Sequence, residues 1–579
     1  MEPIANREVA HIFATVADLL EIKGENFHRV LAYRRAAETI SNLPRDLHAI
    51  HQEDALTDLP NIGATLAEKI EELLTTGELE FYNRLASEIP PGLVQMLEVP
   101  GLGPKRVKQF WQELDITSIE ALKEAAEAGQ LQTLSGMGKK SEQRILEGIE
   151  ALERRTDRTR IGEAYPLAHG LLDRLLEVEG AQKGAVAGSL RRWKETIGDL
   201  DLLIASDTPE PIMDAFATLP EVARVVGKGP TKTTVELHNG HQVDLRVLPP
   251  ERYGTLLVYF TGSKEHNVRL RELALKQGLS LNEHAFTPVE GDGEPILCAT
   301  EEEVYDVLGM PWITPELRED RGEIEAALAG TLPELITLDD IRGDMQSHTT
   351  WSDGKKTVLQ MAKAAAKRGL DYLLITDHSH SLGVVQGVSP DEIAAQKAEI
   401  DAANEALGGS FRVLHGVEVE IRADGTLDYD DETLAGFDLV VASLHTGLRQ
   451  PREQVTERLL NAIRNPHVDI IGHPRGRLIP RREPADLDMD AVFEAAAAHD
   501  VALEINANPH RLDLDDAHAR RAVELGIKLT ISTDAHRPNE FDLMVYGVHI
   551  ARRAWVGPAS VVNAWPLDRV LAWVKARST

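Results

Sequence analysis

The chain has 579 residues, of which 42% are hydrophobic and 27% charged, a composition typical of a folded protein with several domains. A formal net charge of −32 excludes a uniformly basic surface, although local clusters of Lys and Arg remain compatible with nucleic acid. No apolar run is long enough to cross a bilayer, no export signal opens the sequence, and the single cysteine, Cys298, cannot form an internal disulfide, so we expect a cytoplasmic protein.

Residues 1 to about 150 predict an all-helical region, because apolar residues recur at helical spacing, as in Val9–Glu21 and Phe27–Ile40. Within it, a short glycine turn precedes a predicted helix three times, at Leu59–Gly63, Val99–Gly103 and Leu134–Gly138. Backbone N–H groups at such a turn can bind a phosphate oxygen. Paired basic residues follow the second and third turns, which favours the backbone of a nucleic acid as the ligand.

These turns resemble the helix–hairpin–helix motif, which binds the DNA backbone. The resemblance implies that the DNA-binding residues are Gly63, Gly101, Gly103, Lys105, Arg106, Gly136, Gly138, Lys139 and Lys140. The alternative is that all three turns are ordinary connections between helices.

After about residue 155 the pattern changes to mixed helix and strand. Leu200–Ala205 predicts a short strand. Thr233–His238 and Gln242–Leu248 alternate with period two around Asn239-Gly240, which predicts a β-hairpin.

Three aspartates in this region form a candidate metal site. Asp199 and Asp201 are two residues apart at the predicted strand and therefore project to the same face. In the hairpin, apolar residues at 243, 245 and 247 share one face, so Asp244 turns to the other face, where it can join the pair. Such carboxylates hold two Mg²⁺ ions on either side of a transferring phosphoryl group.

The segment before the aspartates offers the groups that a triphosphate requires. Gly188 and Ser189 can offer a backbone N–H and a hydroxyl, and Arg192 can neutralise negative charge. Together with the three aspartates, this combination predicts a nucleotidyltransferase.

The same segment resembles the palm of the family X DNA polymerases, small repair enzymes with a helical lyase domain, fingers, palm and thumb. The resemblance continues downstream and implies a nucleotide site formed by Gly188, Ser189, Arg192, Gly198, Tyr259, Phe260, Gly262, Asn267 and Arg271. By this resemblance, Tyr259 and Phe260 lie beside the incoming sugar, Asn267 reaches the minor-groove edge of the base, and Arg271 contacts the template.

Two positions depart from the family pattern: Lys264 stands where an acidic residue is usual, and Trp193 stands where a glycine is usual. Both positions concern how the nucleotide is held, and neither removes a metal ligand. A nucleotidyltransferase that acts on a small molecule shares the aspartates but does not need three DNA-binding turns.

A resemblance to the small N-terminal domain of the family singles out Lys69. It rests on Tyr33 within Leu31–Ala37 and on Ala67–Ile70 after the first glycine turn. In the family, the lysine at this position attacks the aldehyde of an abasic sugar and forms a Schiff base. Thr65 stands where the family often has lysine, and the alternative is that Lys69 is a surface lysine on a DNA-binding helix.

Residues 310–340 contain several prolines and predict a linker, after which short apolar strands alternate with helical stretches. Seven strands are expected near 344–348, 372–376, 412–415, 438–442, 468–471, 501–506 and 528–532. This alternation is typical of a β/α barrel.

Histidines and carboxylates follow the predicted strands, where β/α barrels carry their chemistry. Their proportion suits Zn²⁺ or Mn²⁺ better than Ca²⁺. The segment resembles the PHP domain (polymerase and histidinol phosphatase), whose trinuclear site cleaves phosphoesters and supplies 3′–5′ exonuclease and abasic-site endonuclease activity in bacterial family X enzymes. The resemblance implies the ligands His348, Asp353, His378, Glu418, His445, His473, Asp534 and His536, with Glu418 bridging.

One ligand position departs from the PHP pattern. The family opens with two histidines spaced two apart, and here the first is Gln346. Because an amide oxygen is a poor replacement for imidazole, we expect one weakly held metal. The alternative is a PHP domain that keeps its fold and has lost catalysis.

The sequence therefore predicts helical lyase-like and fingers domains with helix–hairpin–helix motifs, an α+β nucleotidyltransferase palm and thumb, and a seven-stranded, distorted TIM-like β/α barrel. The expected domains are 1–88 (lyase-like), 89–155 (fingers), 156–250 (palm), 251–325 (thumb), 326–340 (linker) and 341–579 (PHP).

The expected function is that of a gap-filling, template-directed DNA polymerase with a PHP nuclease and a deoxyribose-phosphate lyase activity. We expect a monomer that binds gapped or nicked DNA and dNTPs, with Mg²⁺ or Mn²⁺ in the polymerase site and Zn²⁺ or Mn²⁺ in the PHP site. The alternatives are a PHP nuclease or phosphoesterase that uses the polymerase region as a DNA-binding platform, and a polymerase with a catalytically weakened PHP domain.

Overall fold

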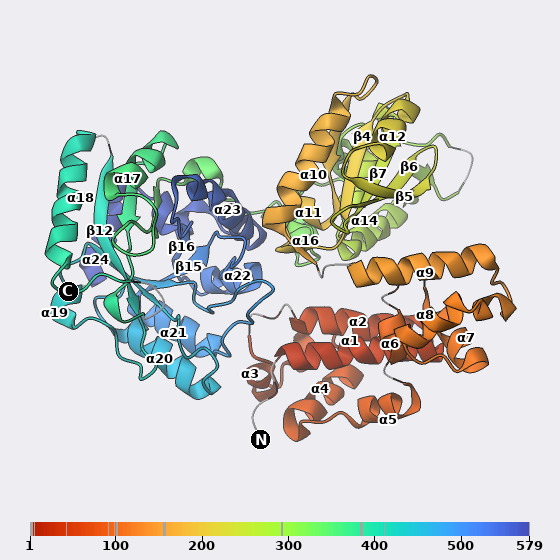
Figure 1. Ribbon diagram of the computed structural model, residues 1–579, viewed down its shortest axis with the longest axis horizontal. Helices are drawn as coiled ribbons and strands as arrows, with labels where there is room; N and C mark the ends of the chain where they lie inside the picture. Colours follow the sequence, from red (N-terminus) through yellow and green to blue (C-terminus); the bar gives the residue numbers. More distant parts are fainter. Residues whose placement is uncertain are drawn as a thin grey trace. The chain divides into compact units, whose positions relative to one another are not determined.

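The computed structural model describes residues 4, 6–41, 43, 45–90, 92–97, 99, 102–154, 158–290, 293–382, 386–409 and 411–577. The chain forms two compact units, residues 1–156 and 157–579 (Figure 1). Among the described helices, none combines the length and apolar character that crossing a membrane requires.

The described part of the first unit is helical, as the spacing of its apolar residues predicted. Helices α1 (Asn6–Lys23) and α2 (Phe27–Ser41) pack against each other through buried apolar faces, with the rings of Phe13 and Tyr33 5.5 Å apart. The other helices are α3 (Leu47–Gln52), α4 (Ala64–Thr76), α5 (Glu80–Glu88), α6 (Gly92–Met96), α7 (Pro104–Leu114), α8 (Ile119–Glu127) and α9 (Lys139–Arg154).

The three glycine turns repeat one geometry. In each, the N–H group of a buried apolar residue donates to the carbonyl three residues earlier; the donors are Ile62, Leu102 and Met137, at 3.2, 3.0 and 3.1 Å. The glycines that follow, Gly63, Gly103 and Gly138, face open space at the starts of α4, α7 and α9. Lys105, Lys139 and Lys140 are exposed in the first turns of α7 and α9, and Arg106 is half-buried, whereas Gly101 lies outside the described residues.

The second unit begins with a five-stranded sheet in the order β2-β4-β7-β6-β5. Its strands are β2 (Lys183–Val186), β4 (Leu200–Ala205), β5 (Val222–Lys228), β6 (Lys232–Leu237) and β7 (Gln242–Leu248). Strands β4 and β7 are parallel, and the other neighbours are antiparallel. The predicted hairpin is confirmed as β6–β7, and its turn contains Gly240 at a φ of 84°, a conformation that glycine adopts without steric cost. Helices α10 (Ile161–Leu176) and α12 (Pro209–Ala217) cover the sheet.

The segment after the sheet forms a separate small core. Its elements are α13 (Tyr253–Thr261), α14 (Lys264–Lys276), β8 (Leu279–Leu281), β9 (Phe286–Pro288), α15 (Glu301–Val307) and α16 (Glu323–Ala329). The linker prediction for 310–340 is wrong in its first part, because Ile313, Leu317 and Ile324 are buried in this core. The prolines suggested a linker, but Pro315 starts a short 3-10 helix and does not interrupt the packing of this core.

The rest of the second unit is a parallel seven-stranded barrel (Figure 1). All seven predicted strands are confirmed: β10 (Gly343–Asp344), β11 (Tyr372–Ile375), β12 (Arg412–Glu420), β13 (Leu439–Ser443), β14 (Ile470–Gly472), β15 (Ala502–Asn506) and β16 (Leu529–Ser532). They pair in sequence order, and a single parallel bridge between Ser347 and Ala535 joins the first strand region to the last. The barrel is therefore nearly closed, and its strand ends converge on one face.

Helices follow the barrel strands, as the alternation of the sequence predicted. They are α17 (Val358–Lys367), α18 (Ile393–Leu407), α19 (Asp431–Leu434), α20 (Arg452–Arg464), α21 (Met489–His499), α22 (Asp516–Glu524), α23 (Met544–Arg553) and α24 (Leu567–Arg577). Their apolar faces pack on strands made almost wholly of buried residues, which is why these strands read as continuous apolar runs.

Candidate active sites

The first site lies at the ends of strands β4 and β7. The parallel register pairs Asp201 directly with Asp244, and Asp199 precedes β4 by one residue. Val243, Leu245 and Val247 are buried on the opposite face of β7, as their alternation predicted. We call Asp199, Asp201 and Asp244 the carboxylate site.

The electrostatics of the carboxylate site fit a divalent cation. Burial, together with the charges of Asp199 and Asp244, raises the pKa of Asp201 to about 7, although Arg246 and Lys232 oppose the shift. Asp244 accepts a hydrogen bond from Thr234 at 2.7 Å and pairs with the Lys232 amine at 2.6 Å. Three carboxylates that repel one another are stabilised by a cation between them, and oxygen donors are what Mg²⁺ prefers.

The glycine at the start of α11 (Gly188–Arg191) is required by its position against the carboxylate site. Gly188 has a φ of +61°, and a Cβ atom there would lie 2.6 Å from the Asp201 Oδ2 atom. No other residue fits without moving that carboxylate. Ser189 follows it and is half-buried, while Gly198 lies beside Arg158 and precedes Asp199.

A pocket of about 290 Å³ brings together most of the expected nucleotide-binding residues. Its lining residues are Arg192, Tyr259, Phe260, Gly262, Lys264, Asn267 and Arg271. The Asn267 amide donates to the Tyr259 carbonyl at 2.7 Å, and the Arg246 guanidinium lies 4.0 Å from the Phe260 ring. Gly188, Ser189 and Gly198 do not line this pocket.

Arg192 is held in place by protein groups. Its Nε atom donates to Glu319 at 3.0 Å, and its Nη1 atom donates to the Thr261 carbonyl at 2.5 Å. Burial alone would raise the pKa of Glu319, but Lys194, Arg553 and Arg192 around it hold that pKa well below its usual value.

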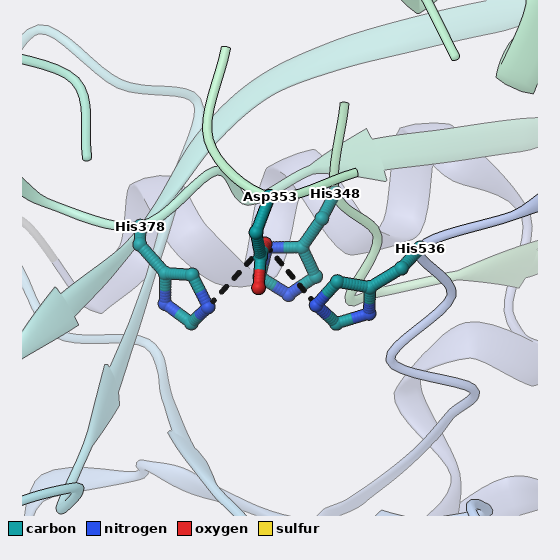
Figure 2. A group of neighbouring side chains, drawn as sticks. All are labelled: His348, Asp353, His378 and His536. Carbon is teal, nitrogen blue, oxygen red and sulfur yellow. Dashed lines mark ion pairs between the residues drawn. The ribbon is translucent and has the colours of Figure 1, made fainter. Parts of the chain in front are cut away.

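The second site lies at the carboxyl ends of the barrel strands. Figure 2 shows the carboxylate of Asp353 between the imidazoles of His378 and His536, with the ring of His348 beside it. The Asp353 Oδ1 atom is 3.8 Å from His378 Nε2 and 3.2 Å from His536 Nε2. Donor atoms of these four residues lie within 4.8 Å of one another, close enough to share an ion.

Glu418 on β12 connects these residues to the other expected ligands. Its Oε2 atom lies 3.0 Å from His378 Nδ1, and its Oε1 atom lies 3.3 Å from His445 Nε2 and 3.1 Å from His473 Nε2. Asp534 Oδ1 is 3.0 Å from His348 Nε2. The structure therefore brings all eight expected ligands into one cluster, which we call the barrel cluster.

The buried atoms of the barrel cluster fit a metal. Both carboxylate oxygens of Glu418 and both ring nitrogens of His348 and His473 are buried, and among the described residues their short contacts within the cluster lack the geometry of hydrogen bonds. Leaving so many polar atoms buried and unpaired is costly, and coordination by an ion removes the cost. Burial opposes ionisation of Glu418, but His378 and His445 lower its pKa well below the usual value. Nitrogen donors beside carboxylates are a set that suits Zn²⁺ or Mn²⁺.

Gln346 is fully buried, two residues before the cluster residue His348. Its backbone N–H group donates to Asp344, but neither polar atom of its side-chain amide has a partner among the described residues. A Cβ atom on Gly472 would lie 3.5 Å from the Gln346 Oε1 atom, so the side chain extends toward β14 and the segment that carries His473.

Sequence reasoning missed functional candidates on β15, which received no predicted ligand. Glu504 is fully buried, and burial, with the nearby charge of Asp534, raises its pKa well above the usual value. Asn506 donates to Asp534 at 3.3 Å, and Arg511 lies 3.6 Å from the same carboxylate. The signal was present as polar residues at alternate positions of an otherwise apolar strand. A further missed residue, Glu420, binds His445 Nδ1 at 2.7 Å and orients that ring.

Lys69 lies on α4 in the first unit and is half-buried. Its amine is 4.6 Å from the centre of the Phe81 ring, which stacks on the buried Tyr33. The guanidinium of Arg29 is 5.2 Å from the same ring. The amine therefore belongs to an aromatic and cationic surface formed by α2, α4 and α5.

Family models match four parts of the chain. Their descriptions are a helix-hairpin-helix domain at residues 4–79, a SAM-like helix-hairpin-helix tandem at 94–151, a DNA polymerase beta thumb at 256–319 and a PHP domain at 344–508. Two of these matches cover the three glycine turns and confirm the prediction that they are helix–hairpin–helix motifs.

Relatives match either the whole chain or one of its parts. The DNA polymerase/3′-5′ exonuclease PolX of Bacillus subtilis is 40% identical over 98% of this chain and 99% of its own length. A probable phosphatase of Caldanaerobacter subterraneus is 30% identical over 33% of this chain and 75% of its own length. DNA polymerase lambda of Rattus norvegicus is 24% identical over 54% of this chain and 56% of its own length.

Proposed function

The chain belongs to the family X DNA polymerases that carry a C-terminal PHP domain, and we propose that it is a template-directed DNA polymerase and 3′–5′ exonuclease that fills short gaps during repair. It acts on gapped or nicked DNA and dNTPs as a monomer in the cytoplasm. The observation that supports this function best is the register of β4 and β7, which pairs Asp201 with Asp244. Arg246, whose charge acts on Asp201, lies over the ring of Phe260, which lines the nucleotide pocket.

In the polymerase site, Asp199, Asp201 and Asp244 would hold two Mg²⁺ or Mn²⁺ ions, which supply charge neutralisation and activation of the primer hydroxyl. Gly188 lets the chain pass close to these carboxylates, so that the start of α11 and the Ser189 hydroxyl face the triphosphate. Arg192 neutralises the triphosphate, while Tyr259 and Phe260 form the wall for the sugar. Asn267 is oriented by its bond to Tyr259, and Arg271 reaches the template.

In the PHP domain, the barrel cluster would hold Zn²⁺ or Mn²⁺ ions, which supply an activated water and a Lewis acid for phosphoester cleavage. The side chains of Asp353 and His536 are each 27% exposed, whereas that of Glu418 is 1% exposed, so a DNA end reaches the cluster from the Asp353 side. Glu420 and Asn506 orient the ligands His445 and Asp534. The same cluster would act on abasic sites.

The test is to incubate the purified protein with a gapped duplex whose primer carries a 5′ label, with and without dNTPs, in Mg²⁺ and in Mn²⁺. We expect extension to the end of the gap when dNTPs are present and shortening from the 3′ end in Mn²⁺ when they are absent. Extension without shortening would favour a polymerase with a catalytically weakened PHP domain. Shortening without extension would favour a nuclease that uses the polymerase region as a platform.

A second activity, deoxyribose-phosphate lyase, is favoured by the half-buried amine of Lys69 beside Phe81. The aromatic ring and the neighbouring arginines can orient a sugar phosphate against the amine. Borohydride should trap a covalent complex with a 5′-deoxyribose-phosphate end, and Lys69→Ala should lose most of it. Exposed Lys363, on α17, provides the control, since Lys363→Ala should trap normally. Equal trapping by Lys69→Ala and wild type would show that another amine reacts.

A further inference from the structure

The palm segment 192–195, which we call the palm loop, joins α11 to the strands that carry the carboxylate site. It runs from Arg192 to Glu195, directly before β3 (Thr196–Ile197). Each of its four residues contacts the PHP domain or a group shared with it.

The charged residues of the palm loop meet two PHP segments. Arg553, the last residue of α23, donates to the Arg192 carbonyl at 2.5 Å and to Glu319 at 2.9 Å. Glu319 is the carboxylate that also holds the Arg192 side chain, and Lys194 lies 3.3 Å from its other oxygen. Farther along the loop, Arg477 binds both carboxylate oxygens of Glu195, at 3.1 and 2.5 Å.

Arg553 is itself fixed from the PHP side. Its side chain is only 2% exposed, and its Nη2 atom donates to Asp516, the first residue of α22, at 2.7 Å. One planar guanidinium thus bridges a PHP helix start, the carboxylate that holds Arg192 and the backbone of Arg192. Lysine cannot make these contacts together, because it lacks the fork of donors that arginine has.

Trp193 supplies the apolar half of the contact and departs from the glycine usual in the family. It keeps a left-handed φ of 56°, which a bulky residue rarely adopts and glycine adopts freely. Its ring lies on the imidazole of His549, with centroids 3.6 Å apart and planes 6° from parallel, and on the ring of Tyr165 at 4.8 Å. Residue 193 therefore has a backbone conformation typical of glycine, while its tryptophan side chain packs against α23.

We propose that the PHP domain is a structural part of the nucleotide site: Arg553 and His549 position the palm loop so that Arg192 faces the incoming triphosphate. Arg553 is a positioning residue, since it touches Arg192 and Glu319 and not the nucleotide. When Arg192 turns to the triphosphate, Glu319 keeps Arg553 and Lys194 as partners, so Arg192 is released without leaving a buried carboxylate unpaired. This inference rests on the proposed polymerase function.

The test compares Arg553→Ala with Arg552→Ala in the full-length protein. Arg552 is the neighbouring residue on the same helix and also crosses to the polymerase region, where it binds Glu316, but it does not reach the palm loop. For each protein we would measure binding of a fluorescent dATP analogue to a Mg²⁺ complex with gapped DNA ended by a dideoxynucleotide, and the KM and kcat of extension on an extendable primer. We expect Arg553→Ala to raise the dissociation constant and KM about tenfold with kcat within about twofold, and Arg552→Ala to change neither beyond about twofold.

His549→Ala and His549→Phe form a second pair that removes less buried charge, because the His549 side chain is 22% exposed. The alanine variant should raise KM severalfold, and the phenylalanine variant should restore it, since an aromatic face remains for Trp193. Wild-type nucleotide affinity in Arg553→Ala, or equal losses in Arg552→Ala and Arg553→Ala, would overturn the positioning role. Because binding is measured without catalysis, a wild type that binds the nucleotide but does not extend a primer would contradict the polymerase function alone.

Discussion

The carboxylate site and the barrel cluster both offer donor atoms that suit divalent ions, but they differ in exposure and in the kind of donor atom. The carboxylate site offers oxygens only, Asp199 is exposed, and Asp244 already has Lys232 and Thr234 as partners. The barrel cluster offers nitrogens and oxygens, and several of its buried atoms make no hydrogen bond to the described residues. We therefore expect the first site to exchange its ions with solvent and nucleotide, and the second to keep them as part of the fold.

The largest expected effect comes from removing the carboxylate site. Asp199→Ala combined with Asp201→Ala should reduce nucleotide addition on the order of 10⁴-fold or more, because residues that act as a unit in the transition state cannot replace one another. Primer extension under single-turnover conditions measures the loss. DNA binding and exonuclease activity should stay at wild-type levels. Synthesis above a trace in the double variant would contradict the assignment of these aspartates.

Removal of metal should affect the polymerase and exonuclease activities differently. After dialysis against a chelator, added Mg²⁺ should restore synthesis at once, whereas exonuclease activity should return only when Mn²⁺ or Zn²⁺ is supplied. The free energy of unfolding of the barrel should fall by about 4 kcal/mol in the chelated protein, compared with protein in free metal at about a thousand times its dissociation constant. Calorimetry with and without chelator measures this change. An unchanged barrel transition would mean that the cluster is stable without metal.

Gln346→His should increase the difference between the two sites, because it gives the barrel cluster an imidazole at a position that now carries an amide. The Gln346 side chain is fully buried with an unpartnered amide, so an imidazole of similar length meets an environment that already accepts a polar group. We expect metal content to rise toward three ions and the exonuclease rate to rise about tenfold. Metal analysis beside a digestion time course provides the measurement. If wild type already carries three ions and digests DNA at the rate of the variant, the weak-ligand interpretation of Gln346 is wrong.

The smallest effect concerns the glycine turns of the first unit, which we expect to bind phosphate without metal. Replacing exposed Lys105 and neighbouring Arg106 by alanine should weaken binding to all DNA sequences alike and reduce the slope of log K against log salt by about 2. Fluorescence anisotropy at several salt concentrations measures the slope. Lys139→Ala with Lys140→Ala should behave in the same way. An unchanged slope would mean that these basic residues do not contact the DNA backbone.

Much of the barrel could be predicted from the sequence because parallel strands that are buried on both faces appear as apolar runs, and all seven were found. The hairpin β6–β7 could also be predicted, since the Asn239-Gly240 turn and the alternation of β7 both indicate a β-hairpin. The linker prediction failed at residues 310–329, where prolines occur inside a packed core. Proline restricts the backbone in the same way in both settings, so composition alone cannot separate them.

The sequence allowed some of the site residues to be predicted, but not others. Residues that end strands could be found, because a His or Asp after an apolar run is conspicuous. Glu504 was missed because it lies within β15 and its role depends on burial that only the closed barrel creates. The contacts of Trp193, Arg477 and Arg553 could not be predicted either, since they join segments hundreds of residues apart in the chain.

The central claim, that one chain carries two metal-dependent sites with separate ligands, is tested most directly by His378→Ala on the gapped duplex with a 5′-labelled primer. His378 contacts both Asp353 and Glu418, so its loss disrupts both halves of the barrel cluster without touching the carboxylate site. We predict that the variant extends the primer at the wild-type rate in Mg²⁺ with dNTPs and does not shorten it in Mn²⁺ without them. Loss of extension together with shortening, or shortening at the wild-type rate, would contradict the account.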